Sequence, residues 1–241
     1  MNIAIVGATG NVGRKILKVL ELKKFPIDQL YLVASHKSVG KKISFNGKDC
    51  EVLNLETFDF TNVEIAFFSA GGKISEQYAA KAAKHSTVID NSSHFRMDPD
   101  VPLIVPEVNF KDLKDYKKKN IIANANCSVI PLVVALKPLH DLYNIKRIVA
   151  STYQSVSGAG KAPMDELLSQ TKDFFEGKEL NSKFFTKQIA FNAIPHIDSF
   201  LEDGYTKEEQ KMHDEVKKII DSKIKITSTS VRIPVLVSHA V

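Results

Sequence analysis

The sequence lacks several features that would assign it to large classes of protein. Only two of its 241 residues are cysteine, Cys50 and Cys127, so a disulfide framework is excluded and a reducing, cytoplasmic location is expected. It has no run of about 18 uninterrupted apolar residues, so no membrane-spanning helix is expected. The first residues show no signal peptide, and we interpret residues 2–6 as a core strand.

Arginine is scarce, and basic residues are not clustered. Arginine occurs only at positions 14, 96, 147 and 232, although 33 basic and 28 acidic residues give a net charge of +5. Scattered lysines are typical of a solvated surface. A nucleic-acid site would need clustered basic residues with aromatic side chains among them, so no nucleic-acid partner is expected. The charge balance instead suits small anionic substrates. Neither cysteine has a second cysteine or histidine at ligand spacing, so no metal is expected.

The first half of the chain alternates short apolar runs with segments of helical periodicity. This alternation is typical of a parallel sheet with helices on both faces, a Rossmann-type α/β fold. The expected strands are residues 2–6, 30–34, 65–68, 87–90 and 121–123, and the expected helices are residues 11–22 and 74–84.

The second half has longer, β-branched runs and fewer alternations, which favours an α+β domain. We expect helices over 127–142, 161–176 and 206–222, and strands over 146–156, 225–231 and 232–237. Pro138 should kink or end the first of these helices. We expect a dinucleotide-binding domain over 1–125 and a catalytic domain over 126–241. Because the chain stops directly after an apolar strand, we expect the second domain to be incomplete at its C-terminus.

Three glycines, Gly7, Gly10 and Gly13, lie between the first strand and the first helix. Glycine allows a tight turn and a close approach of the backbone, and the helix N-terminus then offers N–H groups to a pyrophosphate. A tight turn that needs only small residues would give the same pattern. The position of the motif after a strand and before a helix favours dinucleotide binding.

The end of the second strand indicates which dinucleotide is bound. NAD sites usually carry an acidic residue there, which holds the ribose hydroxyls. Here the run is Ala34-Ser35-His36-Lys37-Ser38, with hydroxyl groups and a lysine that could hold a 2′-phosphate. The sequence therefore favours NADP, unless Lys37 is an ordinary loop lysine.

Cys127 lies in the run Asn124-Ala125-Asn126-Cys127-Ser128, between an expected strand and an expected helix. An isolated cysteine is often a small buried apolar residue. A helix N-terminus, however, favours the thiolate form, and Asn126 could donate to an oxyanion. A thiol beside a dinucleotide site suggests a thioester that exchanges hydride with the cofactor. Among seven histidines, His239 stands out because it follows a strand that could display its side chain.

Several motifs, in order along the whole chain, resemble the aspartate-semialdehyde dehydrogenase family. They are the glycine motif at 7–13, Ala-Ser-x-x-Ser-x-Gly-Lys at 34–41, Asn91-Ser-Ser-His-Phe-Arg96, Asn126-Cys127, Gln154-Ser-Val-Ser-Gly-Ala-Gly-Lys161, Glu208-Glu-Gln-Lys211, and Val231-Arg-Ile-Pro-Val235 with His239. The resemblance implies NADPH-dependent conversion of L-aspartyl 4-phosphate into L-aspartate 4-semialdehyde and phosphate. This reaction leads toward lysine, methionine, threonine and isoleucine.

The resemblance also implies roles for individual residues. Cys127 would be the nucleophile, His239 the acid/base, and Gln154 the group that orients the acyl chain. Arg232 would pair with the substrate carboxylate and Glu208 with its amino group, while Arg96, Lys211 and Asn126 would hold the phosphate. The implied cofactor contacts are Gly7, Thr9, Gly10, Asn11, Val12, Gly13, Ser35, Lys37, Ser38, Ser157 and Gly158.

The resemblance implies a homodimer formed through the second domain. Two alternative functions for the chain stay open. One alternative is the related N-acyl-glutamyl-phosphate reductase family, whose cysteine lies in a Gly-Cys-Tyr-type context that Asn126-Cys127-Ser128 does not match. The other is a non-catalytic NADP-binding fragment, although the retained Cys127 and His239 argue against a decayed relative. Family members continue well past the catalytic histidine, whereas this chain ends two residues after it.

Overall fold

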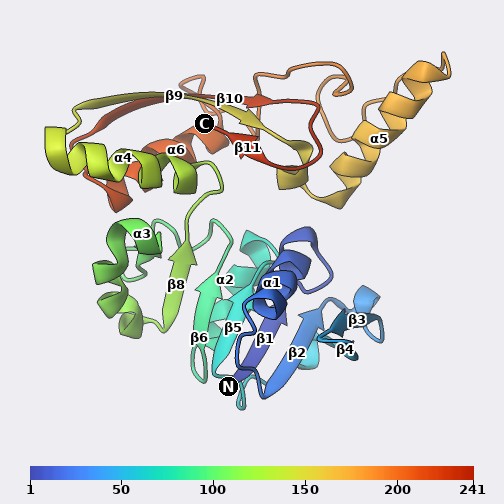
Figure 1. Cartoon of the computed structure of the whole chain (residues 1–241), viewed down its shortest axis with the longest axis vertical. Helices are drawn as coiled ribbons and strands as arrows, with labels where there is room; N and C mark the ends of the chain where they lie inside the picture. The colour runs from blue at the N-terminus through green and yellow to red at the C-terminus, as the bar shows by residue number, and fades with distance from the viewer. The chain divides into compact units, whose positions relative to one another are not determined.

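The computed structural model describes residues 1–241, and the chain divides into two compact units (Figure 1). The first unit is Met1–Ala125 and the second is Asn126–Val241. The first contains an eight-stranded sheet and the second a three-stranded sheet. None of the helices combines the length and the apolar character that crossing a bilayer requires.

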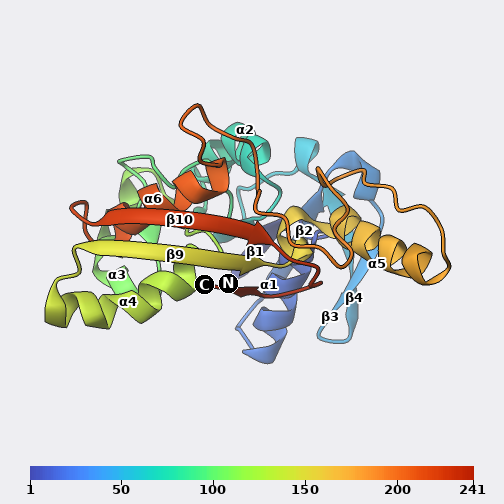
Figure 2. The ribbon, with the colours of Figure 1, turned by 90° about the horizontal axis from the view of Figure 1, so that it is seen from above.

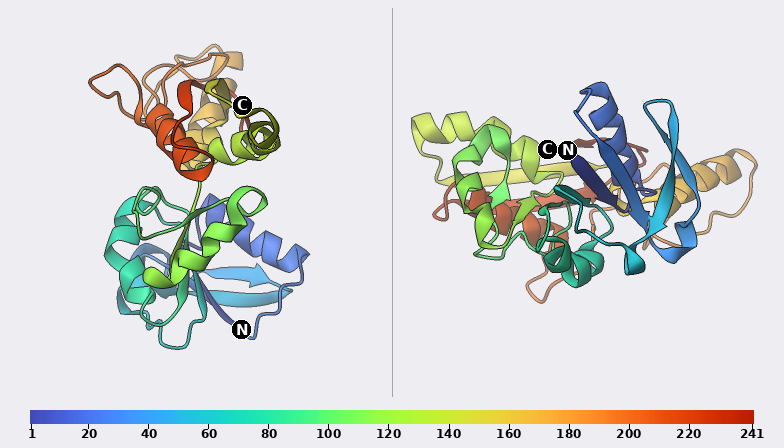
Figure 3. Two further views of the ribbon diagram at one scale, coloured as in Figure 1. Left: turned by 90° about the vertical axis from the view of Figure 1, so that its left-hand side faces the viewer. Right: turned by 90° about the horizontal axis from the view of Figure 1, so that it is seen from below.

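The first unit is a mostly parallel sheet with the strand order β3-β4-β2-β1-β5-β6-β8-β7. Only the β3–β4 pair is antiparallel. Helices α1 and α2 lie on opposite faces of the sheet (Figure 3). The predicted α/β class with a Rossmann-type first domain is confirmed. The elements are β1 (Asn2–Val6), α1 (Asn11–Leu22), β2 (Gln29–Ala34), η1 (His36–Ser38), β3 (Lys42–Phe45), β4 (Lys48–Asn54), η2 (Leu55–Thr57), β5 (Ile65–Phe68), α2 (Gly72–Ala82), β6 (Thr87–Asp90), β7 (Leu103–Ile104), α3 (Pro106–Asn109), η3 (Phe110–Lys118) and β8 (Ile121–Asn124).

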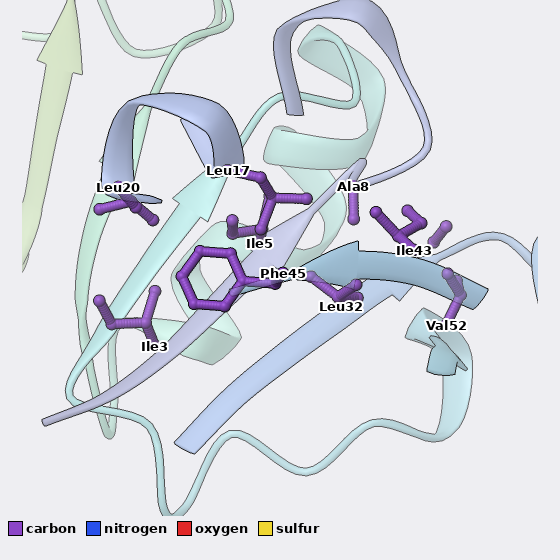
Figure 4. Close-up of a cluster of buried hydrophobic side chains, with 10 residues drawn as sticks. Ile3, Ile5, Ala8, Leu17, Leu20, Leu32, Ile43, Phe45 and Val52 are labelled. Carbon is purple, nitrogen blue, oxygen red and sulfur yellow. The ribbon is translucent and has the colours of Figure 1, made fainter. Parts of the chain in front are cut away.

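The core of the first unit forms where α1 packs on β1 and its neighbours (Figure 4). Ile3 and Ile5 of β1 are fully buried, and Leu17 and Leu20 of α1 lie over them. Each fully buried aliphatic side chain of this size stabilises the fold by roughly 1.5–3 kcal/mol. The buried residues of α1 recur at helical spacing, which explains why its bounds could be predicted from periodicity.

The β3–β4 hairpin was not among the expected elements. Its turn consists of Asn46 and Gly47, with φ values of 49° and 75°. Asn-Gly between two strands is the preferred sequence of a two-residue hairpin turn with two positive φ angles. The dipeptide therefore carried a signal for this hairpin that strand periodicity alone did not reveal.

The second unit is a three-stranded sheet of order β10-β9-β11 with helices packed beside it. Strands β9 and β10 run parallel and side by side (Figure 2), and β11 pairs antiparallel with β9. Helix α6 packs on β10 and on α4. The elements are α4 (Val129–Tyr143), β9 (Arg147–Gln154), η4 (Val156–Ala159), α5 (Lys161–Phe175), α6 (Lys207–Ile219), β10 (Lys225–Arg232) and β11 (His239–Ala240).

One local expectation in this unit was wrong. Residues 233–237 do not form a strand: β10 ends at Arg232, and the loop that follows it bonds to residues 156 and 157. In that loop, the carbonyls of Val235 and Leu236 accept hydrogen bonds from the N–H groups of Val156 and Ser157, at 2.9 and 3.2 Å. Helix α4 runs through Pro138 to Tyr143, one residue beyond the predicted bound of 142, and Asn144 ends it in the left-handed conformation, with φ at 54°.

Candidate active site

Cys127 lies in a short turn that leads into α4, and it is exposed. The turn holds it one residue before Ser128, the N-cap of the helix. Cys50, by contrast, lies within β4 and is only partly exposed. Neither cysteine takes part in a disulfide. The thiol of Cys127 is therefore accessible at the entrance to α4.

The residue before the thiol, Asn126, is held at every one of its polar groups. Its backbone N–H donates to Glu215 Oε2 at 2.6 Å, and its side-chain Nδ2 donates to Glu208 Oε1 at 3.0 Å. Its Oδ1 accepts from the N–H of Ser128 at 2.8 Å. The Asn126 carbonyl accepts from the first two N–H groups of α4, both at 3.0 Å. The backbone that enters Cys127 is therefore fixed from several directions.

Glu208, in the first turn of α6, joins three groups of the site. Its Oε1 accepts from Asn126 and from Gln154 Nε2 at 3.2 Å, and its Oε2 accepts from Lys211 Nζ at 3.0 Å. Burial would raise the pKa of Glu208, but the charge of Lys211 and the hydrogen bonds from Asn126, Lys211 and Gln154 lower it below its ordinary value. The carboxylate is consequently ionised at neutral pH.

Lys211 follows Glu208 by one helical turn and contacts two carboxylates. Its Nζ lies 3.0 Å from Glu208 and 2.8 Å from Asp198. Burial would lower the pKa of Lys211, yet Glu208 and Asp198 raise it above its ordinary value. Asp198 is held in the left-handed region, with φ at 69°. The ammonium group is thus charged and fixed in place.

Three predicted site residues form one row across the three-stranded sheet. Gln154 of β9 is the register partner of Arg232 in β10 and of His239 in β11. Paired residues of neighbouring strands point to the same face of a sheet. The pairing therefore brings together side chains that lie far apart in the sequence. Gln154 is buried and also donates to Ser128 Oγ.

Arg232 places a buried positive charge at this row. Its Nη1 donates to the Ser155 carbonyl at 2.6 Å, and the residue is 7% exposed. Burial lowers the pKa of Arg232, while the negative charges of Glu208 and Cys127 act in the opposite direction. The guanidinium therefore lies within electrostatic range of both the carboxylate and the thiol.

His239 lies against Ser155 and Gly158. The Ser155 N–H donates to its Nδ1 at 3.0 Å, and the Ser238 carbonyl lies 3.0 Å from the same nitrogen. A Cβ atom at Gly158 would come within 3.3 Å of His239 Nε2 and 3.5 Å of Arg232 Nη1. Burial lowers the pKa of His239, and the charge of Arg232 lowers it further. The lowered pKa keeps the imidazole predominantly neutral at neutral pH.

The glycine loop of the first unit fits a dinucleotide phosphate. Gly7 has φ at 89°, and a Cβ atom on it would lie 2.8 Å from the Ser69 carbonyl oxygen. A Cβ atom on Gly13 would lie 2.3 Å from the Gly7 oxygen. These two positions require glycine, and the loop leads directly into the N-terminus of α1 at Asn11 and Val12. Backbone N–H groups at such a helix end bind phosphate.

The remaining predicted residues are distributed over both units. Gly10 is the N-cap of α1, and Thr9 lies one residue before it. Ser35, Lys37 and Ser38 lie at the short η1 helix directly after β2, where Lys37 is exposed. Ser157 lies in η4, and its Oγ is 2.8 Å from that of Ser155. Arg96 belongs to the first unit, where its Nε donates to the Asn124 carbonyl at 2.9 Å.

The second unit thus brings seven of the predicted residues together, and it adds others that sequence reasoning missed. The seven are Asn126, Cys127, Gln154, Glu208, Lys211, Arg232 and His239. The additional residues are Ser155, Asp198 and Glu215, which contact His239, Lys211 and Asn126 respectively. Only Glu215 had a sequence signal, its spacing of seven from Glu208, which places both on one helix face. No group of three or more histidine, cysteine, aspartate or glutamate side chains that could hold a metal ion occurs in the structure.

Both units match domain families of known proteins. Residues 2–116 match the family described as semialdehyde dehydrogenase, NAD binding domain. Residues 136–241 match the family described as semialdehyde dehydrogenase, dimerisation domain. Together these matches cover most of the chain.

Individual relatives are similar along almost the whole chain. An aspartate-semialdehyde dehydrogenase from Aquifex aeolicus is 58% identical, over 99% of this chain and 71% of the relative. Another from Legionella pneumophila is 50% identical, over 100% of this chain and 70% of the relative. Among solved structures, the Vibrio cholerae aspartate semialdehyde dehydrogenase II complexed with ASA is 52% identical and has a TM-score of 0.97. That likeness covers 99% of this chain and 71% of the solved chain.

Proposed function

The chain belongs to the aspartate-semialdehyde dehydrogenase family, and on that premise we propose that its second unit forms an acyl-thioester on Cys127. The reaction is the NADPH-dependent conversion of L-aspartyl 4-phosphate into L-aspartate 4-semialdehyde and phosphate. It is a step toward lysine, methionine, threonine and isoleucine. The observation that supports it most strongly is the exposed Cys127 thiol, on an anchored turn and within electrostatic range of Arg232.

Cys127 and His239 carry out the covalent steps. Neutral His239 accepts the thiol proton, and the thiolate attacks the acyl carbon. The carbon–oxygen bond to phosphate breaks, phosphate leaves with the bonding electrons, and a thioester remains on Cys127. NADPH, when bound, would supply the hydride that reduces this thioester. When the carbon–sulfur bond then breaks, His239 returns the proton to sulfur and the aldehyde is released.

The charged groups around Cys127 hold the substrate. Arg232 binds its α-carboxylate, since a guanidinium suits bidentate carboxylate recognition, and Glu208 binds its amino group. Gln154 orients the acyl chain from the middle strand of the row. Within the second unit, Lys211 and Asn126 hold the phosphate. Arg232, Glu208 and Lys211 each carry the charge opposite to that of the substrate group that they bind.

The first unit binds NADP in this proposal. The glycine loop and the N-terminus of α1 hold the pyrophosphate, and Lys37, with Ser35 and Ser38, holds the 2′-phosphate at the end of β2. The mechanism needs Cys127 in the reduced form, so the protein works in the reducing cytoplasm. It acts as a homodimer through the dimerisation domain.

The test is phosphate-dependent reduction of NADP with aspartate semialdehyde as substrate. Wild-type protein should form NADPH only when phosphate is present and should lose this activity after thiol alkylation. Cys127→Ser should lower kcat by more than about 10³-fold while leaving NADP binding unchanged. Cys50→Ser, the matched control at the other cysteine, should keep wild-type kcat. Wild-type turnover in Cys127→Ser would exclude the thioester mechanism, and NADP binding without any turnover would favour a non-catalytic protein.

A further inference from the structure

We propose that Glu215 is a positioning residue for the nucleophile, acting on Cys127 through the backbone of Asn126. The proposal extends the proposed function, because it assumes that Cys127 is the nucleophile. Glu215 lies in the third turn of α6 and is 1% exposed. Its Oε2 accepts the Asn126 N–H at 2.6 Å. Neither the thioester chemistry nor substrate binding otherwise uses this carboxylate.

The two carboxylates of α6 hold Asn126 from different directions. Glu208 and Glu215 are seven residues apart, which is about two helical turns, so they lie on the same face of α6. Glu208 accepts from the side chain of Asn126, and Glu215 accepts from its backbone. The first contact fixes the amide group, whereas the second fixes the chain itself. Glu208 is also shared with Lys211 and Gln154, so its contact with Asn126 depends on those two side chains as well.

The chemistry of this contact explains why a carboxylate occupies a buried position. A buried charge is costly unless strong hydrogen bonds offset the cost. A backbone N–H that donates to a carboxylate makes a short, charge-assisted bond, which is stronger than a neutral one. The donor belongs to the peptide group between Ala125 and Asn126, one residue before the peptide bond to Cys127. A shift of this N–H therefore displaces the backbone that carries the thiol. Misplacement of a reacting group by about 1 Å costs up to about 10²-fold in rate.

The experiment compares variants at position 215 in the NADP-reduction assay. Glu215→Met keeps the side-chain volume but removes the acceptor, and it should lower kcat by about 10- to 100-fold with little change in the KM for NADP. Glu215→Gln retains an acceptor oxygen and should recover most of the lost kcat. The rate of iodoacetamide alkylation at Cys127, followed by peptide mass spectrometry, should change in Glu215→Met, while the rate at Cys50 should not.

Glu209 provides the matched control on the same helix. It is also buried, and its Oε1 accepts a backbone N–H, that of Ser230, at 2.9 Å. Glu209→Met should lower the unfolding temperature without lowering kcat, because Ser230 is not attached to the nucleophile turn. Equal losses of kcat in Glu209→Met and Glu215→Met would show a merely structural role and overturn the proposal. Wild-type kcat in Glu215→Met would overturn it as well.

Two further outcomes separate this proposal from the proposed function. If Glu215→Met does not fold, Glu215→Asp decides, because it withdraws the acceptor by one methylene. A wild-type kcat in Glu215→Asp would overturn the proposal. If the wild-type protein itself shows no turnover, the proposed function fails. The alkylation rates of Cys127 would still test whether Glu215 positions the thiol.

Discussion

At the scale of single residues, His239 differs from an ordinary surface histidine through its surroundings. Burial and the charge of Arg232 both lower its pKa below the ordinary value of 6.5. A lowered pKa keeps the imidazole neutral as the pH falls, so the base form persists into mildly acidic solution. We therefore expect the acid limb of kcat/KM to lie below pH 6.5, as a pH–rate profile would measure. An acid limb above pH 6.5 would contradict the assignment of His239 as the base.

His213 offers a control for the assignment of His239 as the catalytic base. It is buried in α6, its pKa is also lowered by burial, and its Nε2 lies 3.1 Å from Ser228 Oγ. His239→Gln should lower kcat by about 10²- to 10⁴-fold, while His213→Gln should leave kcat unchanged. The comparison separates general acid–base catalysis from the loss of any buried histidine in this unit.

The residues of the candidate site were easier to predict from the sequence than the contacts between them. Cys127 and its helix entrance could be recognised from sequence, because an expected strand and an expected helix flank it. The row formed by Gln154, Arg232 and His239 could not, because it depends on the register of three strands. The contact of Asp198 with Lys211 could not be recognised from sequence either. Asp198 is a loop residue in the left-handed conformation, and the contact depends on the fold of that loop. The catalytic and binding roles of all these residues stay predictions.

At the scale of elements, the junction of β1 and α1 depends on Gly13. A Cβ atom there would lie 2.3 Å from the Gly7 oxygen and 2.8 Å from the Ala8 Cα, both backbone atoms that cannot turn away. Gly13→Ala should therefore destabilise the protein by about 1–3 kcal/mol and weaken NADP binding, because α1 must move from the loop. Thermal unfolding and NADPH titration measure the two effects.

Gly72 is the matched control for this substitution. It is the first residue of α2, and a Cβ atom there would meet nothing nearer than 4.0 Å. Gly72→Ala should leave both the unfolding temperature and NADP binding close to wild type. Unchanged NADP affinity in a folded Gly13→Ala protein would show that the loop does not hold the cofactor.

Apolar periodicity predicted the bounds of an element best where a single face of that helix or strand packs on a single hydrophobic core. Helix α1 and strands β1, β5 and β6 have the bounds that apolar spacing predicts. The prediction failed at residues 233–237, where an apolar run follows Arg232 without forming a strand. Pro234 lacks an N–H group, and the neighbouring carbonyls bond to residues 156 and 157 instead. An apolar run alone does not determine whether a backbone pairs as a strand.

At the scale of the whole molecule, the exposed face of β9 offers a surface for the proposed homodimer. Residues of this strand alternate between exposed and buried, and Val149 and Tyr153 are 68% and 53% exposed. Arg147 and Ser151 lie on the same face of the strand. Exposed apolar side chains that share a face of a sheet suit an interaction surface. They lie within the region that matches the dimerisation domain family.

We expect the wild-type protein to sediment as a dimer, at twice the chain mass of 26.8 kDa. Tyr153→Glu should weaken this dimer by at least about tenfold in Kd, which corresponds to about 1.4 kcal/mol, because a charge would be buried without a partner. Leu22→Glu is the matched control, since Leu22 is 71% exposed on α1 of the other unit. Sedimentation over a range of protein concentrations measures both variants. If Tyr153→Glu stays dimeric down to the same protein concentration as the wild type, the interface lies on another face of the second unit.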